Sequence, residues 1–168
     1  MKEPILSLKN VVCKQKNTNV LSIKKFDIFP GATYLINGDM CTGKTLLLDV
    51  INNKSRYDGK VFFNSKLLKS YSSSELSSSF AYVEQKNKLP YFKTVKSYIE
   101  SIIKKKSESA TSVQSRLNNI VKIMNLKPIL ESKVRALTVG QFRWVVLSAH
   151  IASFPKVLFI DEIEQHLS

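Results

Sequence analysis

The chain has 168 residues and a formal charge of +13, which comes from 26 Lys and Arg against 13 Asp and Glu. A chain of this length can bury a core as one domain without disulfide or metal support. Cys13 and Cys41 stand in no Cys-x-x-Cys or Cys/His spacing, which argues against a zinc site and a disulfide framework. Because an early Glu3 argues against a signal peptide and no apolar stretch reaches membrane-spanning length, we expect a soluble chain that at most lies beside a membrane.

The positive charge is concentrated in one segment. Between Lys86 and Ala136 there are twelve Lys or Arg and three Glu, a net +9 of the total +13. A charge run of this kind is usually a solvated helical face. Two alternatives remain open, a face that docks on a membrane or another protein and a face that binds nucleic acid.

The first half of the chain alternates short β-leaning runs with turn residues. Apolar runs bounded by Gly or Pro predict strands, and Leu47, Leu48 and Ile51 recur at helical spacing. A serine-rich stretch at 70–79 is typical of a polar loop or weak helix. In chain order, the expected elements are strands at 5–12, 20–29 and 33–37, a helix at 44–53, and strands at 60–64 and 80–85.

The second half changes to a helical period at Thr94. Two T-x-x-Q patterns, Thr111 with Gln114 and Thr138 with Gln141, predict capping boxes. The expected elements are helices at 94–106, 111–125 and 140–152, followed by a buried strand of the parallel kind at 156–160. One apolar face of the second helix is expected to hold Val113, Leu117, Ile120, Val121 and Met124.

The strongest motif is GDMCTGKT, Gly38 to Thr45, which fits G-x-x-x-x-G-K-[ST] between a predicted strand and a predicted helix. A turn of this kind aims backbone N–H groups and a helix N-terminus at a phosphate. Lys44 is expected to reach the β- and γ-phosphates, and the Thr45 hydroxyl is expected to ligate Mg²⁺. The alternative is a chance glycine turn before a helix.

Two weaker patterns lie nearer the end of the chain. In VLFIDE, Asp161 and Glu162 emerge from a buried strand, where one carboxylate can hold a metal-bound water and the other can orient an attacking water. An ordinary acidic surface turn is the alternative. In LTVGQ, Thr138 is expected to cap a helix whose free N–H groups point outward, and capping alone is sufficient locally.

The order GDMCTGKT, YVEQ, LTVGQ, VLFIDE resembles the ATP-binding-cassette (ABC) ATPase family over nearly the whole chain. The resemblance implies an α/β P-loop NTPase fold with a mainly parallel sheet, N-terminal antiparallel strands and an inserted α-helical subdomain. It implies one nucleotide-binding domain over 1–168, with a β-rich P-loop core at 1–85, a helical subdomain at 86–139, and the signature helix and Asp-Glu strand at 140–168.

The resemblance also implies ATP and Mg²⁺ as cofactors and assigns residues to them. The implied ATP contacts are Gly38, Asp39, Met40, Cys41, Thr42, Gly43, Lys44, Thr45 and Leu46, and, across a head-to-tail dimer, Leu137, Thr138, Val139, Gly140 and Gln141. The implied Mg²⁺ ligands are Thr45, Gln85 and Asp161, and the implied catalytic residues are Glu162 and Gln85.

Several positions depart from the family pattern. Gln15 stands where the family stacks adenine on an aromatic ring, Leu46 replaces a hydroxyl residue, and Val139 replaces the first signature glycine. A lost stacking contact costs ~1–3 kcal/mol and a lost hydrogen bond to a charged group ~1.5–3 kcal/mol. A simple sum of these costs would weaken ATP binding by roughly two to four orders of magnitude. Because neighbouring effects rarely add, the expectation is weak binding and not its absence. The family's switch histidine and its central strand are expected after Ser168 and are missing.

The leading hypothesis is the soluble ATP-binding subunit of an ABC transporter, which binds and hydrolyses ATP. The resemblance implies a homo- or heterodimer of such subunits, membrane-embedded partner subunits, and a cytoplasmic place at the inner membrane. A non-catalytic ABC module that acts as an interaction subunit is the alternative. A nucleic-acid-associated ABC protein ranks lowest, because the sequence has no basic motif interleaved with aromatic residues.

Overall fold

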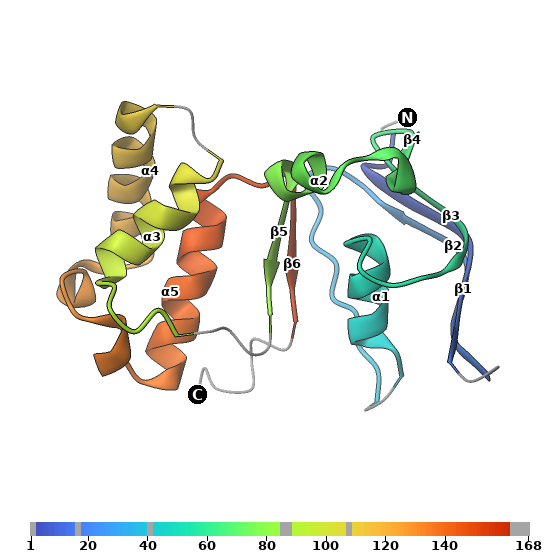
Figure 1. Cartoon of the computed structure of the whole chain (residues 1–168), viewed down its shortest axis with the longest axis horizontal. Coiled ribbons are helices and arrows are strands. Elements are labelled where there is room, and N and C mark those ends of the chain that lie inside the picture. The colour runs from blue at the N-terminus through green and yellow to red at the C-terminus, as the bar shows by residue number, and fades with distance from the viewer. Residues whose placement is uncertain (1–2, 16–17, 40–41, 85–88, 107–108, 162–168) are drawn as a thin grey trace. The chain divides into compact units, whose positions relative to one another are not determined.

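The computed structural model describes residues 3–15, 18–39, 42–84, 89–106 and 109–161, and it divides the chain into two compact units, Met1–Leu76 and Ser77–Ser168 (Figure 1). The first unit holds a four-stranded antiparallel sheet in the order β2-β1-β3-β4. Its strands are β1 (Leu6–Gln15), β2 (Thr18–Ile28), β3 (Asp58–Phe63) and β4 (Lys66–Leu67).

The alternation of buried and exposed residues along β1 shifts by one residue in the middle of the strand. Leu6 and Leu8 are buried before Asn10, and Val11 and Cys13 are buried after it. Asn10 has a φ of 50°, a left-handed conformation that Asn tolerates better than most residues. The register against β3 shifts at this place, so one irregular residue keeps the apolar side chains on the same face of the sheet.

Helix α1 (Lys44–Ile51) lies beside this sheet in the first unit (Figure 1). It buries Leu47, Val50 and Ile51. The chain returns to β3 through residues 53–57, and the 3₁₀ turn η1 (Leu68–Ser70) follows β4. The predicted helix at 44–53 and the strands around 5–12, 20–29 and 60–64 are confirmed, with ends that differ by a few residues.

The predicted buried strand at 33–37 is wrong for this structure. No described strand is hydrogen-bonded to this segment, and Leu35 is 91% exposed. Tyr34 turns back locally, because its hydroxyl accepts a hydrogen bond from the Phe29 N–H at 3.1 Å and its ring meets Phe26 edge to face. An apolar, β-leaning run becomes a strand only when another backbone pairs with it.

The serine-rich stretch forms a helix, α2 (Ser73–Ser79). The Ser72 hydroxyl accepts from the Glu75 N–H, and the Glu75 carboxylate accepts from the Ser72 N–H at 2.7 Å. This S-x-x-E capping box satisfies two terminal N–H groups in a sequence of low helix propensity. Of the two interpretations that the composition left open, the weak helix is confirmed.

Among its described residues, the second unit holds a pair of parallel strands and three α-helices that lie wholly within it (Figure 1). Helix α5 (Val139–Ala152) carries Val145 and Ala149 into a core that it shares with Ile99 of α3 (Val95–Lys104) and Leu117 of α4 (Ala110–Ile123). None of the described helices is long and apolar enough to cross a membrane. The elements are β5 (Phe80–Val83), α3 (Val95–Lys104), α4 (Ala110–Ile123), η2 (Lys127–Ile129), η3 (Val134–Ala136), α5 (Val139–Ala152) and β6 (Val157–Ile160).

One predicted cap is wrong and another is confirmed. Helix α4 begins before Thr111, because the Ser109 hydroxyl caps it and accepts from the Ser112 N–H. Gln114, the expected partner of Thr111, donates instead to Asn118 at 2.9 Å. A serine two residues upstream competes for the same role, and the T-x-x-Q pattern alone does not decide between them.

Candidate functional site

The loop Gly38–Thr45 leads into the N-terminus of α1 in the first unit. The Lys44 ammonium donates to the carbonyl oxygens of Gly38 at 2.7 Å and of Asp39 at 2.8 Å. The side chain therefore lies back across the loop instead of extending into solvent. This places a fixed positive charge within the turn that the motif predicts for phosphate.

Gly43 makes this turn possible. It is the N-cap residue of α1, with a φ of 88° in the left-handed region. A Cβ there would be 3.4 Å from the Val20 carbonyl oxygen of the neighbouring strand. The Thr42 hydroxyl donates to the Asp39 carbonyl at 2.8 Å, which closes the loop from within. The left-handed backbone conformation is therefore what favours glycine at this position, since a Cβ would make only an ordinary contact with β2.

The N-terminus of α1 has no compensating negative charge of its own. No side chain caps it, and its first turn contains no acidic residue. The first N–H groups of a helix lack intrahelical partners, and they carry the positive end of the helix dipole. Together with the Lys44 ammonium, they make a site that attracts an anion of the size of a phosphate group.

Two further residues of the predicted loop are placed by the structure. The Thr45 side chain is exposed at the first turn of α1, so its hydroxyl is accessible to a metal ion. Leu46 is half-buried. Met40 and Cys41 lie outside the described residues. The predicted adenine position, Gln15, ends β1, but its side chain is also outside the description.

The segment Leu137–Gln141 forms the N-terminus of α5 in the second unit. The predicted capping box is confirmed, because the Gln141 N–H donates to the Thr138 hydroxyl at 3.2 Å and the Thr138 N–H donates to the Gln141 side chain at 3.0 Å. Val139 is 63% exposed, whereas Leu137 packs on the core. Gly140 is half-buried in the first turn of the helix.

Asp161 follows the last residue of β6 and is 7% exposed. Its carboxylate accepts a hydrogen bond from the Tyr82 hydroxyl at 3.4 Å, and its N–H donates to the Val83 carbonyl at 3.0 Å. Gln85 and Glu162 lie outside the described residues. Because β5 and β6 are parallel, the carboxyl ends of both strands meet at the same edge of the sheet.

The expected site residues are therefore divided between the two units. Lys44 and Thr45 belong to the first unit, and Thr138 and Asp161 belong to the second. Within its own unit, each group lies at a strand end or a helix N-terminus, where the motifs predict it.

Two residues that lie beside the motifs in the structure belong to no predicted site. The Asn37 side chain accepts a hydrogen bond from the Gly38 N–H at 2.9 Å, and Tyr82 donates to Asp161. Position 37 directly before the glycine loop carries a signal for this contact, since Asn side chains commonly bond to neighbouring backbone groups. The Tyr82 contact depends on the pairing of strands far apart in the chain, and no local pattern contains it.

Comparison with known proteins gives a consistent result. The family model described as ABC transporter matches residues 21–165. A putative ABC transporter ATP-binding protein of Onion yellows phytoplasma (strain OY-M) is 28% identical over 163 residues, which are 95% of this chain and 28% of the relative. This chain thus spans about a quarter of that relative's length.

Two solved structures share the fold. For CbiO1 of Clostridium perfringens, part of the ABC transporter complex CbiONQ, the TM-score is 0.87 at 22% identity, with 99% of this chain and 68% of that one covered. For a dimeric ATP-binding cassette bound to ADP and Pi, the TM-score is 0.79 at 21% identity, with 97% and 76% covered. This likeness confirms the predicted α/β P-loop NTPase fold.

Proposed function

Because the chain belongs to the ABC transporter family, we propose that it binds ATP at Gly38–Thr45 and serves as the ATP-binding subunit of a transporter. The observation that carries the proposal is the position of the Lys44 ammonium, which is held on the carbonyls of Gly38 and Asp39 at the start of α1. A triphosphate supplies the anionic oxygens that this cation and the free N–H groups of the helix lack.

The residues expected to hold Mg²⁺ suit it chemically. Mg²⁺ prefers hard oxygen ligands such as hydroxyl and carboxylate groups. Thr45 offers an exposed hydroxyl, and the Asp161 carboxylate has a fixed orientation because Tyr82 donates to it. Gln85 is the third proposed ligand. When bound, Mg²⁺ neutralises charge on the phosphate oxygens during transfer.

The proposal extends to hydrolysis. Glu162 directly follows Asp161 in the sequence, and we assign it the role of polarising the attacking water as a general base. Gln85 is assigned to position the metal and that water. Removing a general base typically lowers a rate by about 10²–10⁴. Glu162→Gln is therefore expected to keep ATP binding while phosphate release falls by that factor.

Dimerisation gives Leu137–Gln141 its proposed function. In the cap the Thr138 hydroxyl accepts from the Gln141 N–H, so its own O–H and the N–H groups that precede Gln141 in α5 are the donors left for an ATP phosphate of a partner subunit. The similar solved structure of an ATP-binding cassette bound to ADP and Pi is described as dimeric, which supports a second ABC subunit as the partner. Because the Val139 side chain is exposed at this terminus, we expect a looser approach than glycine would allow.

Exposed apolar residues in the segment that connects β5 to α3 support docking on a membrane-embedded subunit. Leu89, Tyr91 and Phe92 are 54%, 56% and 85% exposed, and the Arg135 guanidinium lies 5.1 Å from the centre of the Tyr91 ring. Clustered exposed apolar residues mark interaction surfaces more often than scattered ones. We therefore propose that the subunit lies at the cytoplasmic face of the inner membrane, bound through this patch.

The docking proposal has a matched test. Phe92→Ser should release the subunit from membranes that contain its partner without changing ATP binding. Ile123→Ser alters another highly exposed apolar residue, 75% exposed on α4, and should leave membrane association intact. Equal membrane association in both variants would count against the patch.

The ATP proposal is tested by calorimetric titration of Mg–ATP into the full chain. Lys44→Ala should raise the dissociation constant for Mg–ATP about tenfold or more, since hydrogen bonds to charged groups are worth ~1.5–3 kcal/mol. Lys122→Ala removes an equal charge from the exposed face of α4 and should match the parent. Identical affinities in all three proteins contradict the assignment. Binding without phosphate release in the parent would leave the non-catalytic module as the function.

A further inference from the structure

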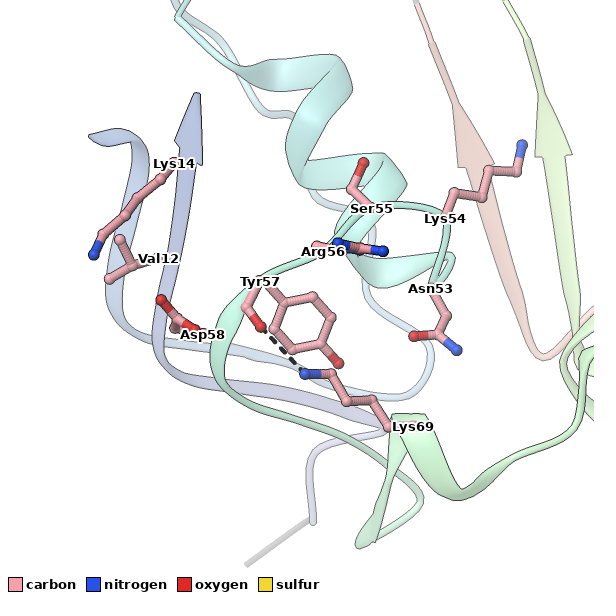
Figure 2. A pocket seen from close by; sticks show the side chains of 9 residues that line it. All are labelled: Val12, Lys14, Asn53, Lys54, Ser55, Arg56, Tyr57, Asp58 and Lys69. Atoms are coloured by element: carbon pink, nitrogen blue, oxygen red, sulfur yellow. Dashed lines mark hydrogen bonds between the residues drawn. The ribbon is translucent and has the colours of Figure 1, made fainter. Parts of the chain in front are cut away.

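A pocket of about 640 Å³ lies in the first unit at the C-terminal end of α1, away from the loop Gly38–Thr45 (Figure 2). Its volume is within the range of small-molecule sites. Residues of β1, of the loop 53–57, of β3 and of η1 line it, and none belongs to the loop at 38–46. The lining residues are Val12, Lys14, Asn53, Lys54, Ser55, Arg56, Tyr57, Asp58 and Lys69.

The charge of the lining is strongly positive. The lining includes four cationic side chains and one carboxylate, a formal charge of 4 − 1 = +3, although Figure 2 shows Lys54 extending away from Tyr57 and Lys69. The exposed Lys14 and Arg56 side chains have no hydrogen-bond or ion-pair partner among the described residues, although Asp58 belongs to the same lining. Like charges gathered around one cavity repel each other, and an anion that enters the cavity relieves the repulsion.

Lys69 is held in place at this pocket. Its ammonium donates to the Tyr57 carbonyl at 3.1 Å and lies 4.1 Å from the centre of the Tyr57 ring (Figure 2). Both contacts fix a cation that would otherwise sample many rotamers, so less entropy is lost when a ligand binds. Lys69 lies twelve positions after Tyr57 in the sequence, so the fold of the intervening segment brings the two residues together.

Tyr57 itself is a second, independent sign of a binding site. The residue is 7% exposed, and its buried hydroxyl has no hydrogen-bond partner within the described part of the chain. Buried polar groups in native proteins usually have a partner, so a donor left without one next to a cationic pocket calls for an explanation. The oxygen is also shielded from solvent, so an oxyanion in the pocket can accept from it only when the Tyr57 ring turns toward the cavity.

We propose that this pocket binds a phosphate ester at a site separate from the P-loop. Arg56 can bind two phosphate oxygens at once, and Lys14 and Lys69 supply point charges beside it. The pocket is larger than a phosphate group alone needs, which leaves room for the organic part of an ester. The phosphate can belong to a soluble metabolite or to a phospholipid headgroup, and the test distinguishes these sources.

The test uses the full chain with Lys44→Ala, so that the P-loop contributes little phosphate binding. Glycerol 3-phosphate is titrated at constant ionic strength against NaCl, and backbone amide shifts are followed by NMR. We expect saturable shifts at residues 53–58. The double variant Lys14→Gln with Arg56→Gln should raise the dissociation constant for glycerol 3-phosphate about tenfold. The control pair Lys60→Gln with Lys122→Gln removes the same charge outside the pocket and should change it less than about twofold.

A variant with the opposite sign guards against misfolding as an explanation. Asp58→Asn removes the one carboxylate of the lining and should tighten binding severalfold. A second arm measures sedimentation with phosphatidylcholine vesicles, with and without phosphatidylglycerol. Dependence on Lys14 and Arg56 in this arm alone identifies a lipid headgroup. The proposal is overturned when vesicle binding does not depend on Lys14 and Arg56 and, in addition, the NMR shifts either do not saturate or weaken equally in the two charge pairs.

Discussion

Tyr57 buries a phenol hydroxyl at a cost that its neighbours do not offset. Its pKa is raised by burial and then by the nearby Cys13. A buried donor without a partner costs about 1–3 kcal/mol. We therefore expect Tyr57→Phe to stabilise the free protein, or at least not to destabilise it, in urea unfolding.

A matched tyrosine provides the control for this measurement. The Tyr71 hydroxyl donates to the Phe63 carbonyl at 2.9 Å, so Tyr71→Phe should lower the unfolding free energy by about 1 kcal/mol. Both substitutions remove one oxygen from a ring that packs in the same unit. Equal losses in the two variants would show that the Tyr57 hydroxyl has a partner.

His150 on α5 links stability to pH. Burial first, and then Lys106 and Lys105, lower the pKa of His150 to about 4. Between about pH 4 and 6.5, His150 is therefore protonated in the unfolded chain but neutral in the folded one. The free energy of unfolding falls as the pH is lowered through this window. Because the ring is partly exposed, we expect a loss on the order of 1–3 kcal/mol.

The variant His150→Gln isolates this effect. Carboxyl groups whose pKa is lowered in the fold, such as Asp27 and Glu75, lose their contribution only below their ordinary values of 3.8 and 4.5. The difference in unfolding free energy between parent and variant should therefore change with pH mainly between about 4.5 and 6.5. A difference that stays constant over this range would contradict the burial of a neutral ring.

At the scale of elements, the junction of β1 and β3 depends on Gly59. Its φ is +94°, and a Cβ would come within 2.1 Å of the Asn10 carbonyl oxygen. Gly59→Ala should therefore destabilise the protein by about 2–4 kcal/mol in thermal or urea unfolding. Gly31→Ala is the control, because Gly31 also has a positive φ but no atom within 4 Å of its Cβ position. It should cost about 1 kcal/mol, and equal losses would count against the close approach of the strands.

Elements were predictable where one local pattern governed them. Leu47 and Ile51 at helical spacing predicted α1, and Thr138 with Gln141 predicted the cap of α5. The segment at 33–37 failed because pairing is decided by another backbone, which the local run does not contain. Ser109 replaced Thr111 as a cap because neighbouring hydroxyl residues compete within one turn.

The candidate site was predictable to the level of its motifs. Lys44 and Thr45 follow from the spacing of GDMCTGKT, and their place at the start of α1 agrees with it. The pocket around Tyr57 was not predicted, because its cations come from positions 14, 54, 56 and 69, which form no short motif. Such a cluster becomes visible only when the antiparallel sheet brings β1 beside the start of β3.

At the scale of the whole molecule, the central claim is that the loop Gly38–Thr45 holds the phosphates of ATP. Amide hydrogen exchange of the full chain with and without Mg–ATP tests it most directly. At a Mg–ATP concentration near the parent's dissociation constant, we predict slower exchange at 42–46 in the parent and much less slowing there in Lys44→Ala, because protection depends on the phosphate held by the ammonium. Protection that is confined to 53–58, or that is undiminished in Lys44→Ala, would contradict the account.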